Sequence, residues 1–151
     1  MSNTALQVPN SIKLAVHCLW ASVLISLCGV LVIFLDPDKN QEIMKHIHKA
    51  GNLGLVFVCF IVLIGLLLVI FLCSVVFDGI KDGKNWARII YLVFCIYSLG
   101  FLLTPFKTPT SIFDVLVDLS AIASLGIKYY AVFLIFTSPG KEWFAKKPAI
   151  E

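Results

Sequence analysis

Long runs of apolar residues, separated by short polar connections, dominate this chain. Uncharged runs cover residues 14–35 and 53–77, and each reaches the about 20 residues that a helix needs to cross the roughly 30 Å hydrocarbon core of a bilayer. A third, shorter run covers residues 89–106 and is preceded by Trp86 and Arg88, an aromatic and a cation that suit the membrane interface. The pattern predicts transmembrane helices at about 12–35, 53–77 and 86–104.

A fourth apolar segment, predicted as a helix at about 112–137, contains Asp114, Asp118 and Lys128. Its fourteen Leu, Ile, Val and Phe residues favour insertion by about 0.3 to 0.6 kcal/mol each, or roughly 4 to 8 kcal/mol together. Asp118 and Lys128 oppose insertion by about 3 kcal/mol each at the membrane centre and by less away from it. We therefore expect this helix to insert against its neighbours.

Composition agrees with a membrane protein, because 60% of the 151 residues are hydrophobic and only 14% are charged, whereas soluble domains are about a quarter charged. Four spans use nearly the whole chain, so residues 1–151 form one transmembrane domain. The expected fold class is all-α, a four-helix transmembrane bundle.

The first run is too long for a cleaved signal and is interpreted as a retained helix. All five cysteines fall inside the apolar runs, where no disulfide framework is expected.

Orientation follows from the distribution of Lys and Arg, because cationic loops stay on the cytoplasmic side. Seven cations lie on one predicted side and four on the other; the seven are Lys13, Lys81, Lys84, Arg88, Lys141, Lys146 and Lys147, and the four are Lys39, Lys45, Lys49 and Lys107. Both termini are thus predicted to be cytoplasmic. Between the first two helices, Pro37, Ile43, Met44, Ile47 and Gly51 fit a short amphipathic helix on the outer surface.

The predicted fourth helix carries one stripe of ionisable residues. Asp114, Ala121 and Lys128 recur every seven residues and stay within about 40° of one another, with Asp118 beside them. Such a stripe should face the bundle or a water-filled crevice, because charges turned toward lipid are penalised. Small residues nearby would let another helix approach closely; they are Ser120, Ala121, Ala123, Ser124 and Gly126.

Two interpretations of this stripe stay open. It is a proton or ion relay, or it is structural, with Asp114 at the interface, Asp118 bonded to another helix and Lys128 reaching toward cytoplasmic head groups. The tilt of the Cα–Cβ bond toward a helix's N-terminus opposes that last contact. His17 lies at a depth that could approach Lys128, although a lone membrane histidine is more often a hydrogen-bonded packing residue.

Catalytic and ligand-binding sets are not recognised in the sequence. No serine or cysteine motif accompanies a base, no vicinal cysteines or paired haem ligands occur, and nucleotide and nucleic-acid motifs are absent. His46 and His48 are two apart, which on a helix points them in opposing directions, so we expect no metal site. The chain is expected to be non-enzymatic, without cofactor, nucleic acid or metal, and to have the lipid bilayer as its solvent.

Two aromatic segments are expected to anchor one membrane face. In the first, Asn85 can cap the incoming helix, Trp86 suits the head-group level and Arg88 can reach lipid phosphate; the second holds Trp143 and Phe144. With its Gly-Lys-Asn-Trp-Ala-Arg and Pro-Gly-Lys-Glu-Trp-Phe segments, the chain resembles small bacterial inner-membrane proteins that have G-x-N-W-A-R at a helix start and P-x-x-x-W-F after the last helix. The resemblance implies a bacterial inner-membrane location and a bundle of this size, and no activity.

These observations favour a protein that works through helix packing with itself or with a membrane partner, in an accessory or immunity-type role. A small proton- or cation-coupled transporter or channel that uses the charged stripe is the alternative. An enzyme acting on lipid at the membrane surface is a third and weaker hypothesis, since the outer loop supplies only scattered groups.

Overall fold

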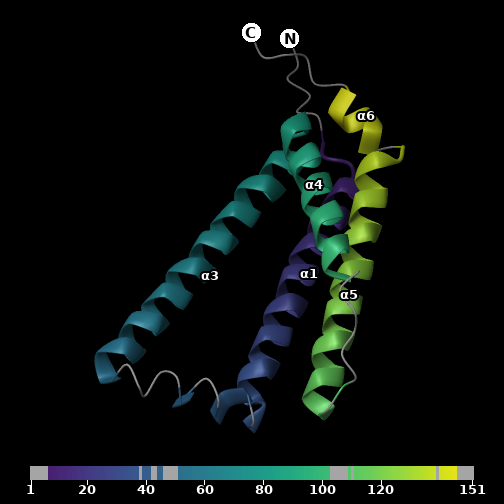
Figure 1. Cartoon of the computed structure of the whole chain (residues 1–151). Coiled ribbons are helices and arrows are strands. Elements are labelled where there is room, and N and C mark those ends of the chain that lie inside the picture. The colour runs from purple at the N-terminus through teal and green to yellow at the C-terminus, as the bar shows by residue number, and fades with distance from the viewer. Residues whose placement is uncertain are drawn as a thin grey trace.

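The computed structural model describes residues 7–37, 39–41, 44–45, 51–102, 109, 111–138 and 140–145, except for the side chains of 51–53, 55, 101 and 102. Within these ranges the regular structure is entirely helical (Figure 1). The helices are α1 (Asn10–Leu35), α3 (Gly51–Lys81), α4 (Asn85–Leu102), α5 (Ile112–Phe136) and α6 (Gly140–Ala145). The predicted all-α class is therefore confirmed.

Three of these helices are long and apolar enough to cross a membrane: α1, α5 and the segment Val56–Lys81 of α3. The third predicted span, at about 86–104, corresponds to α4, which has 18 residues, and its apolar part is shorter than those of the other helices. The structure thus supports a membrane protein with three helices of spanning length. A count of four spans remains a proposal.

The boundaries differ from the sequence prediction mainly at the α3–α4 connection. Helix α3 runs to Lys81, four residues beyond the predicted end, because Phe77 and Ile80 are buried against other helices and extend its packing. The turn after α3 contains Gly83, whose φ of +70° suits glycine. The N–H of Gly83 donates to the carbonyl of Ile80 and that of Lys84 to Gly79, which is the Schellman pattern.

The structure corrects the expected role of Asn85. Asn85 is the first residue of α4 rather than its cap, so Lys84 occupies the preceding position. The cause is the tight turn at Gly83, which returns the chain to helical geometry one residue earlier than predicted. At the other end, the predicted boundary at 104 lies outside the described residues, as does most of the predicted amphipathic helix; of the latter, residues 37, 39–41, 44 and 45 are helical.

Helices α1 and α5 lie side by side along most of their length, and α4 packs across them near α6 (Figure 1). We call this end, which holds the start of α1, the α3–α4 turn and α6, the α6 end, and the opposite one the Lys39 end. The core lies toward the α6 end and includes, among others, Leu19, Ile80, Tyr91, Ile135 and Phe144. Trp20 and Phe77 meet there edge to face, with ring centroids 5.1 Å apart.

Helix α3 diverges from the other helices toward the Lys39 end (Figure 1). Every residue from Val56 to Val69 is exposed, and burial begins only at Ile70. The exposed residues of this stretch are almost all large and apolar, and lipid tails satisfy such side chains as well as protein does. The four helices therefore form a three-helix cluster with one splayed helix, and a closed four-helix bundle is not confirmed.

Candidate functional site

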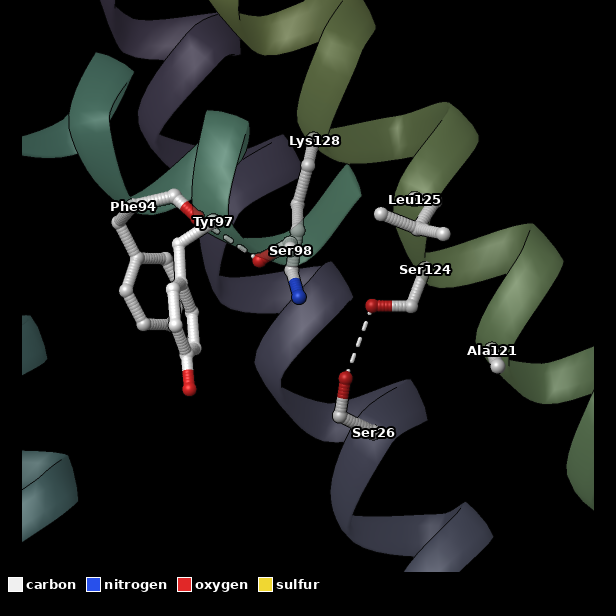
Figure 2. Close-up of a pocket in the computed structure, with 8 residues that line it drawn as sticks. All are labelled: Ser26, Phe94, Tyr97, Ser98, Ala121, Ser124, Leu125 and Lys128. Carbon is white, nitrogen blue, oxygen red and sulfur yellow. Dashed lines mark hydrogen bonds between the residues drawn. The ribbon is translucent and has the colours of Figure 1, made fainter. Parts of the chain in front are cut away.

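A cavity of about 310 Å³ lies where α1, α4 and α5 meet, and Figure 2 shows the side chains around it. It is lined by Ser26 from α1, by Phe94, Tyr97 and Ser98 from α4, and by Ala121, Ser124, Leu125 and Lys128 from α5. The walls combine four hydroxyl groups, two aromatic rings and one amine. Ala121 and Lys128 both belong to the stripe that the sequence singled out, so this part of the stripe faces the cavity.

Lys128 is the ionisable group of this cavity. It lies eight residues before the end of α5 at Phe136, about 12 Å along the helix axis at 1.5 Å per residue. The side chain is half-buried, and its Nζ lies 5.7 Å from the centre of the Phe94 ring. Within the described part of the chain, Lys128 makes no ion pair.

The Lys128 side chain points away from the α6 end. Figure 2 shows the amine directed from the α5 backbone toward the level of Ser124, one turn nearer the Lys39 end. This direction follows from the Cα–Cβ bond, which leans toward the N-terminus of a helix. In the proposed orientation the structure thus does not show the expected contact between Lys128 and cytoplasmic head groups.

The hydroxyl groups beside Lys128 join α1 to α5. The Ser124 hydroxyl donates to the carbonyl of Ser22 over 3.1 Å, which leaves its oxygen free to accept from Ser26, 2.8 Å away. Ser98 donates to the carbonyl of Phe94 within α4. Because the three serine hydroxyls are already engaged in these hydrogen bonds, further donation within the cavity is left to the Lys128 amine and the Tyr97 hydroxyl.

Asp118 does not join Lys128. The two residues are ten positions apart on α5, which corresponds to about 15 Å along the helix, and Asp118 is absent from the cavity lining. Asp118 is half-buried and has no ion pair with any residue that the structure describes. Asp118 and Lys128 therefore do not contact each other in this arrangement.

Asp114 belongs to a separate ionic cluster at the Lys39 end. Its carboxylate is bound by the Lys39 amine and accepts the backbone N–H of Ser111 at 3.2 Å, while Ser111 accepts the N–H of Asp114 in a capping box. Lys39 also lies 3.7 Å from the carboxylate of buried Asp36. The hydrogen bond to Asp114 raises the pKa of the Lys39 ammonium above its ordinary value, and Asp36 adds to the effect.

His17 lies away from the cavity. It is exposed on α1, and its Nδ1 donates to the carbonyl of Lys13, one turn earlier, at 2.6 Å. The structure thus does not bring His17 and Lys128 together. His46 and His48 are outside the described residues; within those residues, no group of three His, Cys, Asp or Glu side chains could hold a metal ion.

The predicted anchors gather at the α6 end, though several of them are packed rather than free. The Arg88 guanidinium lies 5.6 Å from the Phe136 ring centre and 5.1 Å from that of Phe144. Phe144 is only 4% exposed, and the Trp143 indole donates to the carbonyl of Lys81 at 3.2 Å. Trp86 is 42% exposed, as a residue at the head-group level should be.

Comparison with protein-family models, with curated proteins and with solved structures finds no match to this chain. The arrangement itself defines an all-helical protein with three helices of membrane-spanning length and an amine-containing cavity between α1, α4 and α5. Any function must therefore be argued from the residues of that cavity and from the surfaces around it.

Proposed function

We propose that this protein is a non-enzymatic, four-span component of a bacterial inner membrane that works by packing its helices against a membrane partner, either another protein or a further copy of itself. An accessory or immunity-type role fits this description. Three helices of spanning length support the membrane location. The 18 residues of α4 extend about 27 Å, close to the roughly 30 Å of a hydrocarbon core, which supports the fourth span.

The proposed orientation places both termini in the cytoplasm. The α6 end carries the larger share of the chain's cations, among them Lys13, Lys81, Lys84, Arg88 and Lys141. Cations near the ends of spans favour the cytoplasmic side. Trp143 and Arg88 lie at this same end and suit a membrane interface.

The observation that carries the packing function is the contrast between two surfaces. Lipid alone can cover the apolar side chains of α3, but Lys128 and four hydroxyls open to a cavity at membrane depth. Ionisable groups in a membrane are expensive when lipid surrounds them and usually face protein or water. Ala121, which is exposed on α5 and lines the cavity, also leaves room for a neighbouring helix backbone. The α4–α5 surface around the cavity is therefore the proposed partner surface.

Photocrosslinking in native membranes tests this function. Tyr97 is 70% exposed at the cavity, and Phe71 is 66% exposed on α3, so a benzophenone amino acid can replace an aromatic ring at either position. We expect protein adducts from position 97 and only lipid adducts from position 71, because the exposed residues of α3 between Val56 and Val75 are all apolar. An absence of protein adducts from both positions would contradict the proposed function.

A further inference from the structure

Lys128 leaves an electrostatic requirement that the described residues do not meet. Its amine has three donors, lies about 12 Å along α5 from Phe136, and makes no ion pair with any described residue. Its contact with the Phe94 ring, at 5.7 Å, is a weak cation–π interaction. That attraction is smaller than the free energy that moving an ion out of water costs. A carboxylate in the cavity would supply the missing counter-charge.

The cavity has the form that a single acidic side chain needs. Its volume of about 310 Å³ is at the lower end of the range for small-ligand sites. Its side walls are formed by Phe94 and Tyr97, which are 52% and 70% exposed, so the opening is lateral, between helices. An occupant would then enter from the plane of the membrane, with the Ser98 hydroxyl beside the charged pair (Figure 2).

The chain's own acids on α5 do not supply this carboxylate. Asp114 is bound to Lys39, and Asp118 is ten residues from Lys128, or about 15 Å along the axis. In a second copy with the same orientation, Asp118 would be displaced from Lys128 by that same distance along the membrane normal. A parallel dimer therefore cannot pair these two residues, which excludes a second copy in the same orientation as the source of the acid.

A lipid head group is also excluded by depth. Lipid phosphates lie at the membrane surface, whereas the Lys128 amine points away from the nearer end of α5, toward the level of Ser124. We therefore propose that a transmembrane helix of a different protein inserts an Asp or Glu side chain into the cavity and pairs with Lys128. This inference rests on the proposed packing function and specifies the chemistry of the partner.

The test uses the crosslinking amino acid at position 97 in three backgrounds: the parent, Lys128→Met and Lys128→Arg. Truncating one partner of a buried charge pair leaves the other charge buried and unpaired, so we expect Lys128→Met to lower the yield of the hetero-adduct at least about tenfold. Lys128→Arg keeps the cation and should retain most of the hetero-adduct yield. Lys128→Gln serves as a second neutral variant if Lys128→Met does not fold, as judged by the circular dichroism of the detergent-purified protein.

The crosslinked protein must then carry an acidic residue within a transmembrane segment. Neutralising that residue should reproduce the tenfold loss, and exchanging the two charges, with Lys128→Asp and a lysine in the partner, should restore the adduct. A hetero-adduct that is unchanged in folded Lys128→Met overturns this inference and leaves the proposed function standing. An adduct formed only with a second copy likewise overturns this inference and leaves the proposed function standing. If no protein adduct forms in the parent, both the inference and the proposed function are contradicted.

Discussion

At the scale of single residues, two glycines of α3 show how the packing of this helix differs between its middle and its C-terminal end. A Cβ atom added to Gly79 would lie 2.8 Å from the Cβ of Ala87 and 3.1 Å from the Trp86 ring, whereas one added to Gly65 would meet nothing within 4 Å. Gly79 therefore sets how closely α3 approaches α4. Gly65 faces open surroundings and has no packing role in this chain.

Replacing Gly79 by alanine should separate α3 from α4. Because the added methyl group cannot fit without a backbone shift, we expect a loss of about 1 to 3 kcal/mol in the free energy of unfolding. Gly65→Ala is the matched control and should show no loss, since its Cβ meets no neighbour. Unfolding of the purified protein in mixed micelles measures both, and equal stabilities of the two variants would argue against the close approach.

At the scale of elements, the ionic cluster of Lys39, Asp36 and Asp114 holds the segment after α1 against the start of α5. Lys39 contacts Asp114, 75 residues away in the sequence, and Asp36, which is only 3% exposed. The same Asp114 closes the capping box with Ser111. The carboxylate therefore stabilises the first turn of α5 and fixes the position of the preceding connection at the same time.

Between neutral and alkaline pH, the contribution of Lys39 should change only in the strongly alkaline range. Because the folded state raises the pKa of Lys39 above the ordinary 10.5, the ammonium is fully charged below that value and its stabilisation is lost as pH rises through the higher folded-state pKa. The difference in unfolding midpoint between the parent and Lys39→Met should thus stay constant from neutral pH up to about pH 10.5 and shrink above it. A difference that disappears below pH 9 would contradict this assignment.

The sequence predicts helices better than it predicts the contacts between them. The start of α5 at residue 112 was predicted, and its end at Phe136 lies one residue from the predicted 137, because the apolar run marks both limits. The pairing of Asp114 with Lys39 was missed, because Lys39 lies in a connection whose position depends on tertiary structure. The cavity around Lys128 was missed in the same way: its stripe is visible on α5, but Ser26 and Tyr97 come from other helices.

At the scale of the whole molecule, α6 closes one end of the helical cluster. Phe144 enters the core, the Arg88 guanidinium lies near both Phe136 and Phe144, and Trp143 binds the last turn of α3 through the carbonyl of Lys81. Three helices and α6 thus meet in one contact region. From the sequence, Trp143 and Phe144 were interpreted as surface anchors, because aromatic residues after a span suit an interface equally well.

Two substitutions separate burial from hydrogen bonding in this region. Phe144→Ala should cost about 3 to 5 kcal/mol, as for a buried aromatic ring. Trp143→Phe keeps an aromatic ring but removes the indole N–H, and should cost only about 0.5 to 1.5 kcal/mol. Chemical unfolding of the purified variants in mixed micelles compares the two losses in the free energy of unfolding. A smaller loss for Phe144→Ala than for Trp143→Phe would show that α6 is held by the hydrogen bond and not by its buried ring.

The splayed helix α3 makes the shape of the protein sensitive to bilayer thickness. Its apolar segment Val56–Lys81 has 26 residues, or about 39 Å, which exceeds a hydrocarbon core of about 30 Å. Such an excess is accommodated by tilting. Because α3 is held only near its C-terminal end, it can pivot there without disturbing α1 or α5. A thicker membrane would bring it more upright, so the protein would respond to the lipid composition around it.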